Sequence, residues 1–219
     1  MDTSAVEAIL QMPSPSSRQD LQSFLGYLSY VRRHVPALSH TTPTLSSLLK
    51  KSVKFVWTNE HEKAFQKHKE LAGNMATLTH FDEKLEIVLT TDASPVGIRA
   101  CLSHKVTEGN KTFLRPISYA SRSFTPAERN YAQIEREVLA VHWAINYFRQ
   151  FLLCRHFTLQ TDCSALTKIF VPKNDLGGIA RGRMNRWCVD LMEYDFTAQH
   201  IRDKNLVCDG LKVATAFTK

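Results

Sequence analysis

The chain has 219 residues, with 28 Lys and Arg against 21 Asp and Glu, which gives a formal net charge of +7 at pH 7. This basic balance fits a polyanionic partner such as nucleic acid, and equally a soluble basic surface without one. The five cysteines form no Cys-x-x-Cys pair, which argues against a zinc finger or a disulfide framework. No apolar run is long enough to span a membrane. We therefore expect reduced thiols, a cytoplasmic or nuclear location and no membrane partner.

The first eighty residues show helical periodicity and many positive charges. Ser17 and Asp20 have the spacing of a capping box, which predicts a helix start. The helix that follows carries apolar residues at helical spacing: Leu21, Phe24, Leu25, Leu28 and Val31. A short helix over residues 45–49 and another starting at Thr58 complete the segment. Because it lacks a cluster of catalytic residue types, we interpret it as a helical packing module whose Lys and Arg can contact phosphates.

From residue 85 the pattern changes from helices to strands, so we place the boundary near residues 80–86. Strands are predicted over residues 85–91, 97–104 and 111–120, with a turn at residues 108–110. A long helix over residues 133–152 and a fourth strand over 156–161 follow. Residues 164–170 and 180–193 are predicted helices, and residues 194–201 a final strand.

Two of these strands end in the same dipeptide, Thr-Asp. Asp92 follows the apolar, β-branched run of the first strand, and Asp162 follows the fourth. Carboxylates at the ends of neighbouring strands would provide the oxygen ligands that hard divalent cations prefer. A single Asp often ends a strand only because it favours turns, so the pair is more informative than either residue.

The long helix offers a third acid. With about 100° per residue, the buried stripe consists of Ile134, Val138, Val141, Ile145 and Phe148. Glu137 lies about 60° to one side of Ile134, at the margin of the stripe, and can face the strand ends. Glu135 lies about 100° to the other side and is predicted to be in water. The alternative for Glu137 is a solvated flank of the helix.

Several motifs together resemble the ribonuclease H domain of gypsy-type LTR retrotransposon Pol polyproteins. They are Thr-Asp-Ala-Ser at 91–94, Pro-Ile-Ser-Tyr-Ala-Ser-Arg at 116–122, and the segments 125–131, 135–141, 157–162, 183–187 and 193–196. Upstream, residues 21–33 and 53–58 resemble the thumb and connection of the matching reverse transcriptase.

The resemblance implies an α/β ribonuclease H-like fold, a mixed five-stranded sheet with flanking helices, over residues 83–219. Residues 1–82 would be a small helical thumb/connection segment. The implied activity is hydrolysis of the RNA strand of an RNA–DNA hybrid with two Mg²⁺, or Mn²⁺. The catalytic and metal-binding residues carried over are Asp92, Glu137, Asp162 and Asp209. Of these, Asp209 rests on the resemblance alone.

Two features qualify this expectation. The chain has no Asp-Asp dipeptide, so the polymerase motif Tyr-x-Asp-Asp is absent, and the polymerase part of a reverse transcriptase is a possible partner. Arg99 stands where the family usually has Gly, and a long cation in that strand must reach solvent or a carboxylate. The alternative to an active nuclease is a catalytically weak or inactive remnant that only binds nucleic acid or a partner.

Overall fold

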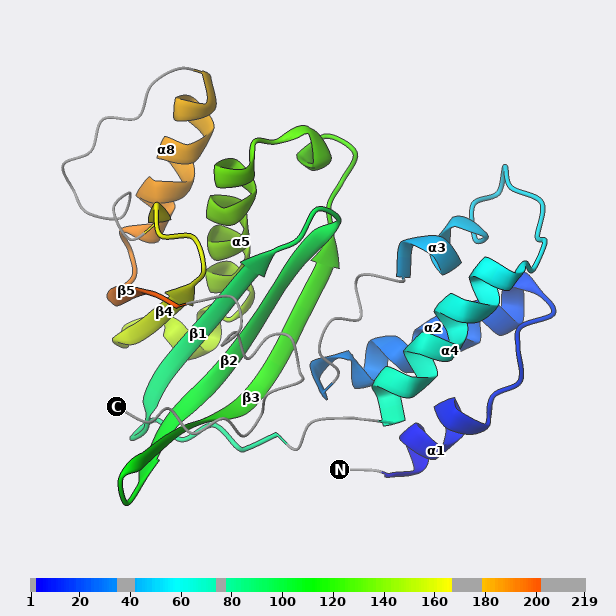
Figure 1. Ribbon diagram of the computed structural model, residues 1–219, viewed down its shortest axis with the longest axis horizontal. Coiled ribbons are helices and arrows are strands. Elements are labelled where there is room, and N and C mark those ends of the chain that lie inside the picture. The colour runs from blue at the N-terminus through cyan, green and yellow to red at the C-terminus, as the bar shows by residue number, and fades with distance from the viewer. Residues whose placement is uncertain (1–2, 35–41, 74–77, 167–178, 202–219) are drawn as a thin grey trace.

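The computed structural model describes residues 3–34, 42–73, 78–166 and 179–201. A group of helices near the N-terminus lies beside a five-stranded sheet whose one face carries further helices (Figure 1). The predicted switch from helices to strands is present, since α4 ends at Gly73 and β1 begins at Glu86.

The described part of the N-terminal segment contains the α-helices α1 (Thr3–Gln11), α2 (Arg18–Val31), α3 (Thr42–Ser47) and α4 (Asn59–Gly73), with the short 3-10 helix η1 (Arg32–His34) after α2. The predicted capping box is confirmed: the Ser17 amide donates to Asp20 Oδ2 at 2.9 Å, and the Asp20 amide donates to Ser17 Oγ at 3.2 Å. These helices share an apolar core of their own, in which Phe24 and Phe65 lie 4.5 Å apart between ring centroids.

The sheet has the strand order β3-β2-β1-β4-β5. Its strands are β1 (Glu86–Ala93), β2 (Gly97–Glu108), β3 (Lys111–Ser123), β4 (Phe157–Thr161) and β5 (Phe196–His200). The first three pair antiparallel, whereas β4 runs parallel to both β1 and β5, so the sheet is mixed. Gly109, with φ of 60°, supplies the left-handed residue of the turn between β2 and β3. The mixed five-stranded sheet is the one that the family resemblance implies.

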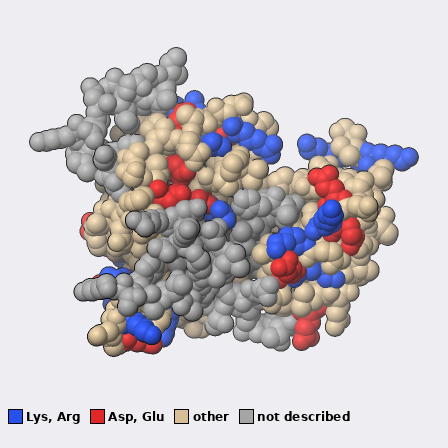
Figure 2. Space-filling model, viewed as in Figure 1, with Lys and Arg blue, Asp and Glu red and all other residues tan. Residues whose placement is uncertain are grey.

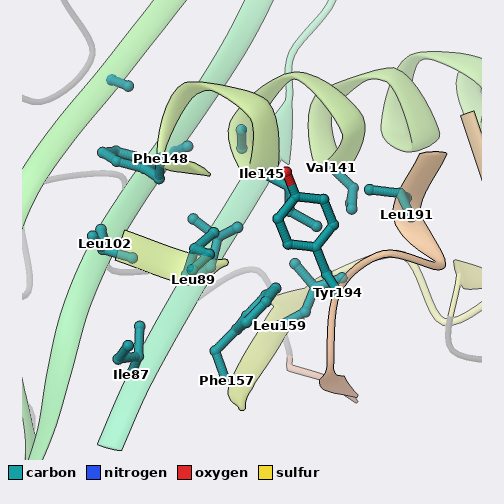
Figure 3. Close-up of a cluster of buried hydrophobic side chains, with 14 of the residues drawn as sticks. Ile87, Leu89, Leu102, Val141, Ile145, Phe148, Phe157, Leu159, Leu191 and Tyr194 are labelled. Carbon is teal, nitrogen blue, oxygen red and sulfur yellow. The ribbon is translucent and has the colours of Figure 1, made fainter. Parts of the chain in front are cut away.

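One face of the sheet is covered by α5 (Gln133–Tyr147) and α8 (Ile179–Leu191) (Figure 1). The buried stripe of α5 packs on alternate residues of β1, β2 and β4, and Leu191 and Tyr194 close the core from the side of α8 (Figure 3). The 3-10 helix η3 (Glu128–Asn130) precedes α5. The helix stripe was predicted correctly because its period of 3.6 residues is a local property.

The predicted single helix over 133–152 is interrupted. After α5 ends at Tyr147, Phe148 adopts φ −97° and ψ 15°, and a short helix α6 (Arg149–Leu152) follows. Phe148 and Leu152 are both buried in the main core, so the apolar spacing continues across the break and conceals it. Of the helix predicted over 164–170, residues 167–170 lie outside the described part of the chain.

Candidate active site

Asp92 and Asp162 lie at equivalent places on neighbouring strands. The parallel ladder between β1 and β4 ends at the pair Thr90 and Gln160, and each aspartate follows two residues later. Because paired strands run about 4.8 Å apart, both carboxylates emerge at the same end of the sheet. Asp92 is buried, whereas Asp162 is partly exposed. In the space-filling view Asp and Glu side chains gather where the end of β1 meets α5 (Figure 2).

Glu137 approaches this end of the sheet from α5. Its side chain is buried, and burial together with the charges of Asp162 and Asp92 raises its pKa to about 8. Because the charges of both aspartates raise the pKa of Glu137, the three carboxylates lie close enough to interact electrostatically. Gln133, one turn earlier on the helix, donates its amide to Glu137 Oε1 and holds the carboxylate in place. The i, i+4 spacing of Gln133 and Glu137 is a sequence signal for this bond that a wheel of apolar residues does not capture.

Local hydrogen bonds hold the chain on either side of the two aspartates. After Asp92, the Ser94 amide donates to the Gly97 carbonyl at 2.9 Å and closes the turn into β2. Before Asp162, the Thr161 hydroxyl accepts the Cys163 amide at 3.1 Å. His200 of β5 donates Nε2–H to the Asp162 carbonyl at 3.0 Å. The backbone that carries both carboxylates is therefore fixed from its own turns and from the adjacent strand.

The sequence predicts that the Arg99 cation reaches either solvent or a carboxylate, and in the structure it pairs with a carboxylate, that of Asp92. It sits directly opposite Asp92 in the β1–β2 ladder. Its Nε donates to Asp92 Oδ2 at 2.9 Å, and a terminal guanidinium nitrogen donates to the same oxygen. Only 17% of the Arg99 side chain and 10% of the Asp92 side chain are exposed. One of the predicted metal ligands is therefore already paired with a cation from the protein.

The prediction for Glu135 is wrong, because this residue is buried rather than in water. Its Oε2 accepts the Ala132 amide at 3.0 Å, which satisfies a free N–H group at the start of α5. Its other oxygen faces Arg183 of α8 at 3.6 Å, and the Arg183 guanidinium lies over the Tyr131 ring, 4.1 Å from its centroid. A wheel drawn for one helix cannot include α8, which covers this side of α5.

Asp209 lies outside the described residues. Among the residues that are described, no three His, Cys, Asp or Glu side chains are arranged to hold a metal ion. The donors nevertheless fit Mg²⁺ in kind, because Asp92, Glu137 and Asp162 offer only carboxylate oxygens and repel one another when ionised. A divalent cation would relieve that repulsion.

A cleft of about 1620 Å³ lies elsewhere, between the N-terminal helices and the region where α5 passes into α6. Its lining within the described ranges includes Tyr30, Arg33 and Arg149 but not Asp92, Glu137 or Asp162. No helix within the described ranges is both long and apolar enough to cross a membrane.

Comparison with solved structures defines the class of fold. The chain superposes on a foamy viral protease–reverse transcriptase solved with double-stranded DNA, with a TM-score of 0.75 and 21% sequence identity, over 93% of this chain and 42% of that one. A foamy viral protease–reverse transcriptase solved with an RNA/DNA hybrid matches with a TM-score of 0.71 and 21% identity, over 100% of this chain and 29% of that one. The fold is ribonuclease H-like, preceded by helices, as predicted.

The sequence comparisons then give the family. Residues 82–194, just over half of the chain, match the RNase H-like domain found in reverse transcriptase, and the chain belongs to that family. It is 34% identical over 215 residues to the retrovirus-related Pol polyprotein from transposon 412 of Drosophila melanogaster, covering 98% of this chain and 17% of the relative. The Tf2-3 transposon polyprotein of Schizosaccharomyces pombe is 31% identical over 211 residues, covering 90% and 15%. The predicted resemblance to retrotransposon Pol polyproteins is confirmed, and the chain spans less than a fifth of these relatives.

Proposed function

We propose that this chain is a ribonuclease H that cleaves the RNA strand of RNA–DNA hybrids as part of a reverse transcriptase polyprotein. The observation that carries the proposal is the position of Asp92 and Asp162, each two residues beyond the β1–β4 ladder, with Glu137 coupled to both. Membership of the RNase H-like family supports it. So does the RNA/DNA hybrid bound by the foamy viral neighbour.

The metal ligands we propose are Asp92, Glu137, Asp162 and Asp209. Two Mg²⁺ ions, or Mn²⁺ in their place, would supply activation of water and charge stabilisation at the leaving 3′ oxygen. The strand pair β1–β4 carries two of the carboxylates at one end of the sheet, and α5 carries Glu137 toward the same end. Gln133 keeps the Glu137 carboxylate oriented. The expected products are 5′-phosphate and 3′-hydroxyl ends.

We also propose the division into a helical thumb/connection segment, residues 1–82, and a ribonuclease H-like domain, residues 83–219. Supporting it, the N-terminal helices have a core that is separate from the core of the sheet. We propose further that the polymerase part of the reverse transcriptase is supplied by another portion of a longer protein or by another chain.

The test is cleavage of a hybrid whose RNA strand is labelled at its 5′ end, in the presence of Mg²⁺. We expect cleavage by the wild type and a loss of at least about 100-fold in rate in Asp92→Asn or Asp162→Asn, because each removes a charged ligand. Asp190→Asn is the control, since this acid lies on α8 and 61% of its side chain is exposed. Failure of the wild type to cleave, or full activity of Asp92→Asn, would refute the proposal.

A second candidate is a remnant that binds nucleic acid without cleaving it. The ion pair between Arg99 and Asp92 favours it, because a ligand oxygen is engaged by the protein itself. This candidate predicts duplex binding that weakens steeply with salt, with no product at any Mg²⁺ concentration. Salt-independent binding would leave it without support.

A further inference from the structure

The Arg99–Asp92 pair differs from the other cross-strand ion pair of the same ladder. Glu86 and Lys105 are opposite each other at the far end of β1 and β2, and 68% and 43% of their side chains are exposed. For Asp92 and Arg99 the exposed fractions are 10% and 17%. The antiparallel register and the Ser94–Gly97 turn bring these two residues opposite each other. The pair is thus a partly buried, built contact and not a transient surface encounter.

Two nitrogens of the Arg99 guanidinium, Nε and a terminal nitrogen, donate to the same carboxylate oxygen, Asp92 Oδ2. An oxygen that already accepts two charge-assisted hydrogen bonds has its lone pairs engaged, and it cannot also bind a divalent cation in the same place. The guanidinium also brings a positive charge to a group of carboxylates that would otherwise repel one another. Arg99 therefore does for Asp92, in part, what a metal ion would do.

We propose that Arg99 is an internal counter-ion of Asp92 that sets the divalent-cation affinity of this site, because a cation can bind Asp92 Oδ2 only after the guanidinium has left that oxygen. The inference rests on the proposed function only in taking Asp92 as a metal ligand. The Arg99 side chain is 17% exposed, so it lies at the boundary between the protein and solvent, where departure of the guanidinium from Oδ2 costs less than in the core. Arg99 is a positioning residue here and takes no part in bond cleavage.

The experiment measures Mg²⁺ and Mn²⁺ binding to the full chain by isothermal titration calorimetry, and melting temperature with and without each ion. The test variant is Arg99→Met, which removes the charge and keeps a long side chain. We expect it to bind the ions about 10- to 100-fold more tightly, the factor equivalent to one charge-assisted contact. We also expect it to melt at a lower temperature in EDTA, because Asp92 then lacks its partner.

Two further variants make the result specific. Lys105→Met is the matched control, since it removes the same kind of cross-strand partner at the other end of the ladder. It should leave the ion affinity unchanged. Arg99→Lys keeps the charge but loses the fork of donors, and its affinity should lie between those of the wild type and Arg99→Met.

Equal ion affinities in the wild type and Arg99→Met, or no binding by either, would overturn the role of Arg99. The same holds if Lys105→Met tightens binding as much as Arg99→Met does. If Arg99→Met binds the ions more tightly but the wild type does not cleave the hybrid, the proposed nuclease activity is refuted and the counter-ion role of Arg99 is supported. Conversely, if the wild type cleaves the hybrid but Arg99→Met binds the ions with unchanged affinity, the nuclease activity is supported and the counter-ion role of Arg99 is refuted.

Discussion

Replacing Glu137 by Gln tests how much the ionisation of Glu137, beside Asp92 and Asp162, lowers the free energy of unfolding. The pKa of Glu137 rises from 4.5 to about 8, first through burial and then through the charges of Asp162 and Asp92. Between these pH values the folded chain keeps a proton that the unfolded chain has lost. Unfolded chains therefore bind fewer protons, and the contribution of Glu137 to stability falls as the pH rises from 4.5 to 8.

The size of this effect follows from the shift. At about 1.4 kcal/mol per pKa unit, full ionisation of Glu137 costs up to roughly 5 kcal/mol in the folded state. Local rearrangement and entry of water reduce such costs, so we expect about 2–3 kcal/mol. A neutral amide at this position has no charge to bury, so Glu137→Gln should be more stable than the wild type by about this amount above pH 8.

The assay is urea unfolding at pH 5, 7 and 9 in EDTA, with the wild type and Glu137→Gln compared at each pH. We expect a difference below about 1 kcal/mol at pH 5 and most of the full difference already present at pH 7. Glu193→Gln is the control, because this residue is 63% exposed in its side chain, and it should track the wild type. If Glu137→Gln were no more stable than the wild type at pH 9, the reasoning about a buried, coupled carboxylate would be wrong.

Three further predictions concern the same domain. Gly97→Ala should lower the free energy of unfolding in urea by about 1–3 kcal/mol, because a Cβ there would lie 2.4 Å from the Arg122 carbonyl oxygen; wild-type stability would contradict this. Glu128→Gln should cost about 1–2 kcal/mol at pH 7, because Glu128 accepts two bonds from Arg122, at 2.7 and 2.9 Å. Burial raises the pKa of Glu128, but these bonds outweigh it and the net shift is downward. Its contribution is therefore lost progressively as the pH falls below about 4.5, and a difference from the wild type that does not shrink between pH 7 and pH 3 would refute the assignment. Finally, Mg²⁺ should raise the melting temperature of the wild type more than that of Asp162→Asn; equal shifts would exclude Asp162 as a ligand.

Several features could be read from the sequence because they depend on neighbours along the chain. The Ser17–Asp20 capping box needs only residues three apart, and the turn at Gly109 needs only a residue that tolerates positive φ. The apolar stripe of α5 and the alternation of the strands are likewise local periodicities. These periodicities predicted the individual strands, and the two Thr-Asp endings suggested that Asp92 and Asp162 could lie side by side. The assembly of the strands into a mixed five-stranded sheet came from the family resemblance.

The tertiary structure decided what depends on residues distant in the sequence. Glu135 is buried because Arg183 of α8 covers it, and no wheel of α5 alone contains that helix. The sequence allowed Arg99 either solvent or a carboxylate, and the β1–β2 register selected Asp92. The pKa of Glu137 is likewise set by burial and by two charges from outside its helix, Asp92 in β1 and Asp162 just after β4. Periodicity assigns a side chain to one face of its own element, whereas its environment is set by the other elements that pack against that face.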